Sequence, residues 1–258
     1  MRTDMGTYSF GKLPAKTRPG VLHLADYLNE TQLPTPPDAY DVMPRVYQAV
    51  GSTDPSQVVP MDGNDANGDC VMAMIAHYST IVNALAGKTL IPPSADVLAA
   101  YYAQTGGQDT GLIEDDALAY WQNSGFFGEK ILARVYIDPT KINHLKLAAW
   151  LFGGVCMGFQ VQQNCISDFD TGIPWTAGPS TGDGHAVLLT SYTATGVAVA
   201  TWGAIQPAQN SWLTMLDEAH IVLPAEAQLP NFCPGFAYQQ LLADAQALAD
   251  PEPGQGKG

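Results

Sequence analysis

The spacing of apolar residues changes at Gly153, and this change constrains the fold more than any other feature of the sequence. Before it, apolar side chains recur at the helical interval in four segments. After it, short apolar runs bounded by turn residues predict strands. Because the helices come first and the strands later, we predict an α+β fold rather than an alternating α/β fold.

The expected elements follow from these patterns. Helices are predicted over residues 70–86, 92–106, 113–125 and 138–154, with a closing helix from residue 236. Strands are predicted over 155–161, 185–192, 196–202 and 220–224, the second and third forming a hairpin. The first 60 residues are rich in proline, so we expect an extended segment there with one short helix over 21–29.

The chain is strongly acidic, which excludes some classes of partner. Its net charge is −14 over 258 residues. A protein that binds nucleic acid needs a basic face, so we expect no nucleic-acid partner. Binding to an anionic membrane surface is disfavoured for the same reason, and no apolar run is long enough to span a bilayer. No signal peptide is recognisable, so we expect a cytoplasmic or virion-associated protein, although export by a route without a signal peptide stays open.

The four cysteines are Cys70, Cys156, Cys165 and Cys233, and they form neither a CxxC pair nor a Cys/His metal motif. Scattered cysteines in a chain without a signal peptide are typical of a reducing compartment. The Asn- and Asp-rich loop before Cys70 fails as a calcium loop, because Gly63 and Met74 fall where carboxylates are required. We therefore expect no metal and no cofactor.

The segment GNDANGDCVMAMIAHY, residues 63–78, places Cys70 at the start of a predicted helix. A lone cysteine is most often a small buried hydrophobic residue. A helix N-terminus also stabilises a thiolate, so the same position suits a nucleophile. Asn64 and Gly68 precede Cys70 in this loop, and GDGHAV places His185 at the start of a predicted strand.

These blocks resemble the papain-like cysteine peptidases. In that family a cysteine opens a helix, an amide side chain lies six residues before it, and a histidine begins a strand of the second half. The positions of Cys70, Asn64, Gly68 and His185 match this pattern, and Trp202–Gly203 matches the family's W-G. The chain also resembles a set of bacterial and phage-type proteins with GDC, GHAV and TWG blocks, for which no activity is established.

The resemblance implies a role for each residue. The thiolate of Cys70 would be the nucleophile, with its pKa lowered by the helix N-terminus and by the His185 imidazolium. His185 would donate a proton to the leaving amine. The backbone N–H of Cys70 and the side-chain amide of Asn64 would hold the oxyanion, although Asn is one methylene shorter than the family's Gln.

The residue that orients the histidine departs from the family pattern. Counting back from Trp202 puts the family's Asn at Ala200, which cannot bind an imidazole. Thr201 is adjacent and carries a hydroxyl, and Asn210 in the following loop is a second candidate. The alternative is a site without a third residue, or one that is no longer catalytic.

Other segments have simpler interpretations. GPSTG, residues 178–182, matches a serine-hydrolase string, but its context lacks the strand and helix, so Ser180 is expected to be a loop residue. Glu114, Asp115 and Asp116 are expected to favour the N-terminus of their helix, with an acidic pair in a substrate groove as the alternative. Trp202 is the tryptophan that the resemblance places near His185.

The resemblance implies one papain-like α+β domain over residues 60–245, with a helical half carrying Cys70 and a strand-rich half carrying His185. Residues 1–59 would be an extension packed on the outside or across the cleft, propeptide-like in the second case, and 246–258 a disordered tail. Two functions remain. One is a thiol hydrolase that cleaves a peptide or amide bond of a peptide or protein substrate through an acyl-enzyme. The other is an inactive papain-fold structural or binding protein, with a protein assembly as its partner.

Overall fold

A mixed sheet forms the centre of the computed structural model, which describes residues 8–16, 20–33, 35–224 and 235–249. The strands lie in the order β1-β3-β8-β4-β5-β6-β7, and β2 pairs with β5. The strands are β1 (Leu22–His23), β2 (Tyr40–Asp41), β3 (Ile131–Tyr136), β4 (Val155–Gln162), β5 (Ser180–Tyr192), β6 (Gly196–Thr201), β7 (Ala204–Gln209) and β8 (Leu216–Pro224). Among the pairings between these strands, only that of β1 with β3 is parallel, and the others are antiparallel.

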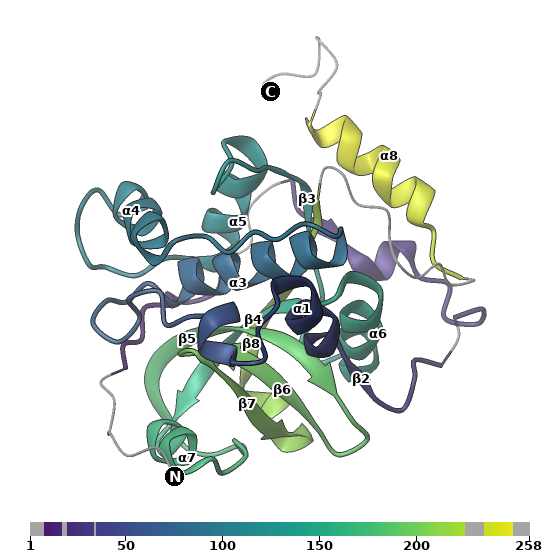
Figure 1. Ribbon diagram of the computed structural model, residues 1–258. Helices are drawn as coiled ribbons and strands as arrows, with labels where there is room; N and C mark the ends of the chain where they lie inside the picture. The colour runs from purple at the N-terminus through teal and green to yellow at the C-terminus, as the bar shows by residue number, and fades with distance from the viewer. Residues whose placement is uncertain (1–7, 17–19, 34, 225–234, 250–258) are drawn as a thin grey trace.

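Helices pack around this sheet (Figure 1). The α-helices are α1 (Met43–Val50), α2 (Pro55–Val58), α3 (Cys70–Leu85), α4 (Ser94–Gln104), α5 (Glu114–Asn123), α6 (Ile142–Phe152), α7 (Cys165–Thr171) and α8 (Tyr238–Ala249). Two 3-10 helices, η1 (Leu24–Tyr27) and η2 (Asn210–Met215), complete the described elements.

Side chains on the two faces of β5 enter two separate hydrophobic cores. Ala186 and Leu188 join the core around α3, whereas Val187 and Leu189 join the core that includes α6, α7 and α8. This division follows from the alternation of side chains along a strand. The sheet is thus covered on both faces, and β5 meets α3 directly.

Helix α3 is the central helix of its half. It begins at Cys70, where the carbonyl of Asp69 accepts from the backbone N–H groups of Met72 and Ala73. Nearly every side chain of α3 is buried, because α1, α4 and α5 pack against it on the sides that the sheet leaves open. Burial on all sides fixes the position of its first residue.

The fold confirms the predicted α+β class, the four central helices and the hairpin of β5 and β6. The prediction for residues 1–59 was partly wrong, because α1 and α2 also lie there; within 21–29 the predicted short helix is the 3-10 helix η1, preceded by β1. Pro44 and Pro55 each occupy the first turn of a helix, where the missing N–H costs nothing. Prolines in this segment therefore begin helices as well as exclude them.

Further elements that were not anticipated are β2, β3, β7, α7 and η2. Strand β3 is held by its pairing with β8, which lies far from it in the sequence. At the C-terminal end, α8 continues to Ala249, so the predicted tail boundary at residue 246 was wrong. The rest of that tail, residues 250–258, lies outside the described residues.

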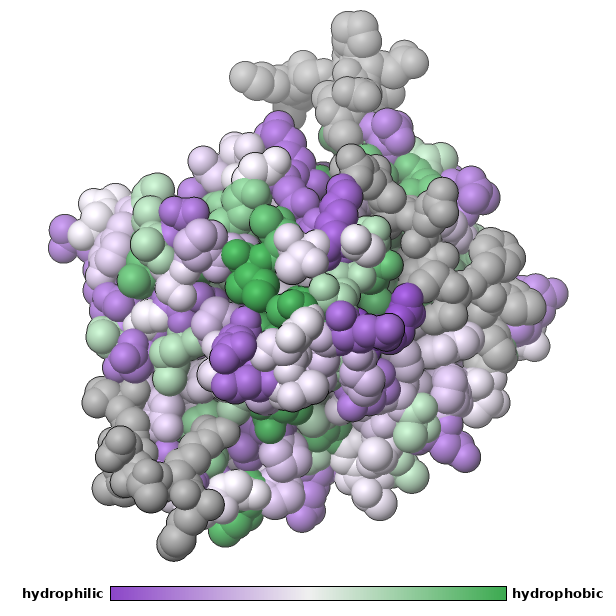
Figure 2. Space-filling view, viewed as in Figure 1, coloured by the Kyte–Doolittle hydropathy of each residue, from purple (hydrophilic) through white to green (hydrophobic). Residues whose placement is uncertain are grey.

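Apolar residues gather near the middle of the face seen in Figure 2 and are surrounded there by polar ones. Among the described residues, no helix combines the length and apolar character that a bilayer crossing requires. Large exposed hydrophobic side chains occur singly, as at Ile173.

Replacing Ile75 with Ala should destabilise the fold more than the same change at Ile173. Ile75 is fully buried in α3, so its truncation should lower the free energy of unfolding by about 2–5 kcal/mol. Ile173 is 52% exposed, and there the loss should be below about 0.5 kcal/mol. Urea denaturation of the two variants measures both values, and equal losses would contradict the described packing of α3.

Candidate active site

Cys70 lies buried at the first turn of α3, and backbone groups of Ala186 and Gly11 lie close to its thiol. Ala186 directly follows His185, so α3 and β5 bring the two predicted residues to the same place. Burial raises the pKa of Cys70 to about 11. The pKa of Cys70 is therefore not lowered as expected. The loss of water around the buried thiol outweighs the stabilisation of a thiolate by the helix N-terminus.

His185 is enclosed by aromatic rings. The indole of Trp202 stacks on the imidazole with 4.5 Å between ring centroids, as predicted for this tryptophan. Phe10 and Phe159 approach edge-on at 5.6 and 5.7 Å. Burial lowers the pKa of His185 to about 3. The imidazole is therefore neutral at pH 7 in this state.

Thr201 provides the hydrogen bond to the imidazole. Its Oγ1 lies 2.8 Å from Nε2 of His185, and Nδ1 has no hydrogen-bond partner among the described residues. Asn210 does not reach the histidine, because its amide donates to the carbonyl of Ala194 at the β5–β6 turn. Of the two candidates, only Thr201 lies at the site. Ala200, where counting placed the family's Asn, is a buried core residue.

The side chain of Asn64 connects both halves of the site. Its Oδ1 accepts from Nε1 of Trp202 at 2.7 Å. Its Nδ2 donates to the carbonyls of Ser9 and Asn67 at 3.0 and 2.9 Å. Both amide hydrogens are thus occupied, one of them by a carbonyl oxygen from the N-terminal segment.

Residues 8–13, which we call the strap, run across the site. Ser9 donates its backbone N–H to Asn64, and Lys12 donates to the carbonyl of Gly184 at 3.2 Å. Gly11 and Leu13 exchange backbone hydrogen bonds with Leu112 at 2.8 and 2.9 Å. The strap therefore contacts loops of the helical half and strand β5 of the other half.

The close approach of the strap to the loop before Cys70 requires glycine. A Cβ added to Gly11 would lie 1.7 Å from the backbone oxygen of Gly68. A Cβ on Gly111 would lie 2.2 Å from the backbone oxygen of Gly11. Backbone atoms cannot move aside as a flexible side chain can, so the closed arrangement depends on these glycines.

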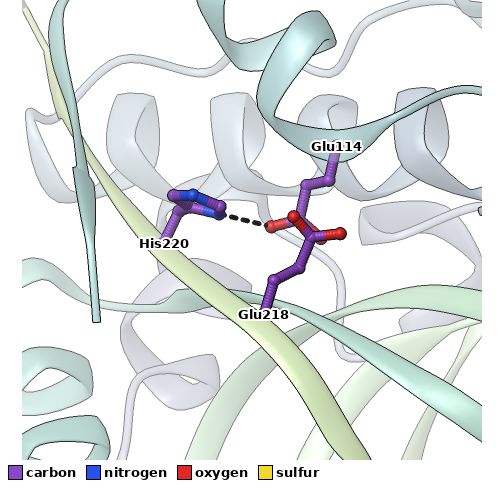
Figure 3. Close-up of side chains that lie close together, drawn as sticks. All are labelled: Glu114, Glu218 and His220. Atoms are coloured by element: carbon purple, nitrogen blue, oxygen red, sulfur yellow. Dashed lines mark hydrogen bonds and ion pairs between the residues drawn. The ribbon is translucent and has the colours of Figure 1, made fainter. Parts of the chain in front are cut away.

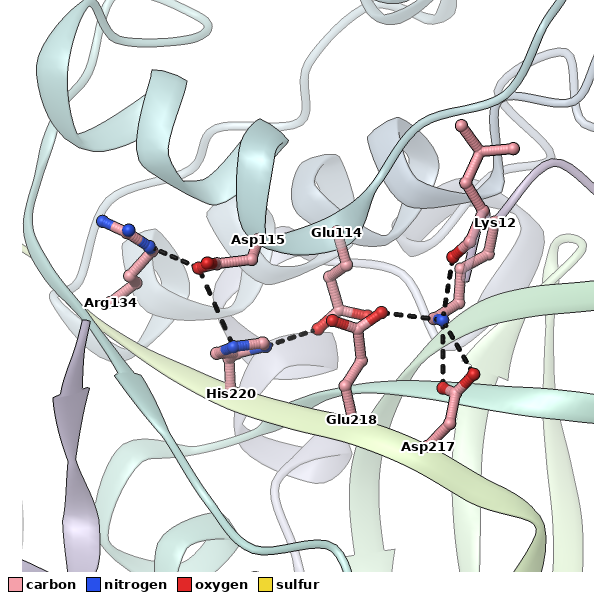
Figure 4. A network of polar contacts seen from close by, with 8 residues as sticks. Lys12, Glu114, Asp115, Arg134, Asp217, Glu218 and His220 are labelled. Atoms are coloured by element: carbon pink, nitrogen blue, oxygen red, sulfur yellow. Dashed lines mark hydrogen bonds and ion pairs between the residues drawn. The ribbon is translucent and has the colours of Figure 1, made fainter. Parts of the chain in front are cut away.

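Lys12 extends from the strap into an acidic pocket (Figure 4). Its Nζ lies 2.7 Å from Oε1 of Glu218 and 3.0 Å from Oδ1 of Asp217. Burial disfavours the ammonium, but the nearby Glu218, Glu114 and Asp217 carboxylates raise the pKa of Lys12 overall. The sequence indicated an acidic pair in a groove only as an alternative for Glu114–Asp116, and it gave no sign of Lys12 or Glu218, because these residues lie in three distant segments.

Glu114, Glu218 and His220 also form the one described group that could hold a metal ion (Figure 3). Their ligand atoms lie within 4.8 Å of one another, and Nδ1 of His220 is 2.9 Å from Oε1 of Glu114. The cation against this group is the Lys12 ammonium. Glu114, Asp115 and Asp116 lie in the first turn of α5, as predicted, and Glu114 and Asp115 are in addition buried, with Asp115 paired with Arg134.

The remaining nucleophile candidates lie elsewhere. Ser180 begins strand β5 and is exposed, so it is neither a loop residue as predicted nor part of a nucleophile turn. Cys156 and Cys165 are buried free thiols, and burial raises the pKa of both. Cys233 lies outside the described residues.

Comparison with known proteins identifies the architecture. No family model and no curated protein matches the sequence. Solved structures do match. Xylellain, a cysteine protease from Xylella fastidiosa, has a TM-score of 0.61 and 15% identity, covering 88% of this chain and all of that one (100%). Digestive procathepsin L2 from Tenebrio molitor larval midgut has a TM-score of 0.59 and 14% identity, covering 85% and 79%.

The Carica candamarcensis cysteine protease CMS1MS2, solved in complex with E-64, has a TM-score of 0.53 and 14% identity, covering 73% of this chain and 99% of that one. At such identities the likeness concerns the fold. Together with the helical half that carries Cys70 and the strand-rich half that carries His185, it shows that this chain has a papain-like α+β fold.

Proposed function

We propose that the protein is a thiol hydrolase that cleaves peptide or amide bonds, with Cys70 as nucleophile and His185 as its acid–base partner. The observation that carries this proposal is the arrangement of the imidazole. Thr201 holds Nε2, while Nδ1 has no hydrogen-bond partner among the described residues and the thiol lies beside Ala186. In this proposal Thr201 is a positioning residue, because it acts through the histidine.

With the strap across the site, the proposed enzyme would be inactive until the strap moves. The strap excludes water from the thiol and the imidazole, and burial keeps both groups neutral. It also engages one amide hydrogen of Asn64 with the carbonyl of Ser9. In this proposal the strap is propeptide-like and must move before a substrate can enter. The similar Tenebrio structure is itself a procathepsin.

The chemistry follows once water and substrate replace the strap. The pKa of His185 rises and that of Cys70 falls, because hydration and the helix N-terminus favour an imidazolium and a thiolate. The thiolate attacks the carbonyl carbon, and the oxyanion accepts from the Cys70 backbone N–H and the Asn64 amide. The imidazolium protonates the leaving amine, and water then hydrolyses the thioester.

A second candidate function is a papain-fold binding or structural protein without catalysis. It is favoured by the buried neutral pair and by Thr201, whose hydroxyl replaces the family's Asn. In that case the strap would be a permanent part of the fold. The two functions differ in one measurable property, the reactivity of Cys70 after the strap is lifted.

Substituting Gly11 with Ala should activate the enzyme. The added Cβ collides with the Gly68 backbone, so the strap is lifted from the cleft. We expect casein hydrolysis at least about tenfold faster than in the wild type, since each ~1.4 kcal/mol lost by the closed state raises the open population tenfold. E-64 should then label Cys70, as mapped by mass spectrometry.

The matched control is Gly178→Ala, where the new Cβ makes only an ordinary contact at 3.6 Å with Gln162. It should behave as the wild type does. Adding Cys70→Ala or His185→Ala to Gly11→Ala should abolish hydrolysis. A Gly11→Ala protein that is folded but inert toward both casein and E-64 would favour the binding protein instead.

The pH dependence of Cys70 alkylation should differ between the closed and open proteins. In the wild type the raised pKa, about 11, keeps Cys70 protonated at neutral pH, so iodoacetamide should react slowly until the pH approaches that value. In Gly11→Ala the midpoint should fall below pH 7, and His185→Ala should return it toward 8.5. A Gly11→Ala midpoint that His185→Ala does not change would contradict a thiolate–imidazolium pair.

Removing the hydroxyl of Thr201 should impair catalysis without impairing binding. In the Gly11→Ala background, Thr201→Val keeps the side-chain shape but loses the hydrogen bond to Nε2. We expect kcat to fall about tenfold with KM unchanged, and Thr201→Ser to restore it. A proportional change of KM, or a Ser variant as slow as Val, would argue against a positioning role.

A further inference from the structure

We propose that the pocket filled by Lys12 is the specificity pocket of the cleft and that it selects substrates with a lysine or arginine side chain. This inference rests on the proposed function, since it names the peptides that the same cleft would cleave. It goes beyond the fold likeness, because the residues that form the pocket belong to this chain.

The backbone of the strap shows where a substrate side chain would lie. Gly11 packs against the backbone of Gly68, two residues before Cys70, its backbone lies near the Cys70 thiol, and the next residue is Lys12. The strap runs here as an extended segment, and its backbone hydrogen-bonds with the backbone groups of Leu112 and Gly184. A bound peptide with a residue at the thiol would therefore direct a neighbouring side chain into the place of Lys12.

The Lys12 side chain is almost completely enclosed, with an exposed fraction of 1%. Its Nζ lies 2.7 Å from Glu218, 3.0 and 3.1 Å from the two Asp217 oxygens, and 3.2 Å from the Leu13 carbonyl. Asp217 Oδ2 and the Leu13 carbonyl accept hydrogen bonds from the ammonium, whereas Glu218 contacts it as an ion pair; Leu13 belongs to the strap, so Asp217 and Glu218 are the partners that the pocket itself offers. These two acidic residues suit a primary ammonium in charge and distance.

Gly158 on β4 gives the pocket its depth. A Cβ at this position would lie 1.8 Å from Cε of Lys12 and 2.9 Å from Cγ of Glu218. Any side chain here would occupy the space through which the lysine stem passes. A long, thin side chain can therefore reach the acidic end of the pocket.

The titratable groups that face the pocket are mostly carboxyl groups. Glu114 comes from α5, whereas Asp217, Glu218 and His220 come from β8 (Figure 4). Arg134 is engaged by Asp115, and burial lowers the pKa of His220, so the imidazole adds no charge at neutral pH. Lys12 is thus the cation that faces these three carboxylates.

Glu114 supplies an independent indication that the pocket is built for a donor. It is fully buried, and its Oε2 has no hydrogen-bond partner among the described residues. Burial raises the pKa of Glu114 to about 8, although Lys12 opposes this. A guanidinium carries five N–H donors and is longer than an ammonium, so an arginine substrate could satisfy this oxygen as well.

An apolar or acidic side chain would leave these carboxylates without a counter-charge. A site with buried polar groups strongly rejects a ligand that cannot pair with those groups. An apolar pocket rejects a ligand of the wrong size less strongly. The cleft should therefore discriminate against leucine and most strongly against glutamate in this pocket.

The test uses the full chain with Gly11→Ala and Lys12→Ala, which lifts the strap and removes the competing lysine. The substrates are internally quenched peptides with Lys, Arg, Leu or Glu placed before or after a glycine. Both orders are needed, because a substrate can run parallel or antiparallel to the strap. We expect kcat/KM for Lys and Arg peptides to exceed that for Leu peptides at least about tenfold.

In the same background, Glu218→Gln should reduce the ratio of Lys to Leu cleavage about tenfold, because it removes the closest carboxylate. Glu30→Gln is the matched control, since Glu30 is 75% exposed and distant in the sequence, and it should leave the ratio unchanged. If Glu218→Gln does not fold, Gly158→Ala tests the same pocket by blocking the lysine stem.

Cleavage without a basic preference, or a ratio that Glu218→Gln or Gly158→Ala leaves unchanged, would overturn this inference while the proposed hydrolase stands. No cleavage of any peptide would reject the hydrolase. The pocket is then judged by calorimetry with the blocked tetrapeptide Phe-Gly-Lys-Leu, the strap sequence, and its Phe-Gly-Leu-Leu analogue. Binding at least about tenfold tighter for the lysine peptide supports the pocket, and equal affinities overturn it.

Discussion

The packing of α3 against β5 is the contact on which the rest of the site depends. Helix α3 is buried on nearly all sides, so its first residue cannot shift without disturbing one of the two cores. Strand β5 is fixed by β4 and β6 on either edge. Cys70 at the end of one element and His185 near the start of the other are thereby brought together, although 115 positions separate them in the sequence.

Two opposing electrostatic effects act on this site, and their sizes decide its state. A charge at a helix terminus typically gains about 0.3–1 kcal/mol, or less than one pKa unit. Burial acts in the other direction, and it raises the pKa of Cys70 from 9.0 to about 11. Desolvation therefore prevails while the strap is in place. In the proposed hydrolase, water access rather than the identity of the residues would control whether the thiol is reactive.

In the acidic pocket, burial and a nearby charge likewise act on the pKa in opposite directions. Glu218 and Glu114 lose water, which raises the pKa of Glu218 to about 7 and that of Glu114 to about 8. The Lys12 ammonium offsets part of this penalty through direct ion pairs. Strap and pocket are therefore coupled, because removal of the lysine leaves buried carboxylates that need water or another cation.

Local signals in the sequence determined the α+β class, the helices α3 to α6 and the β5–β6 hairpin, and they gave Cys70, His185 and Asn64 as candidate site residues, because periodicity and motif spacing act over short distances. They also gave Thr201 as a candidate, but not the choice between it and Asn210. Tertiary structure alone decided that choice, the course of the strap, the pairing of β3 with β8 and the acidic pocket around Lys12. These four features depend on contacts between distant segments and on the exclusion of water. Neither produces a local pattern in the amino-acid sequence.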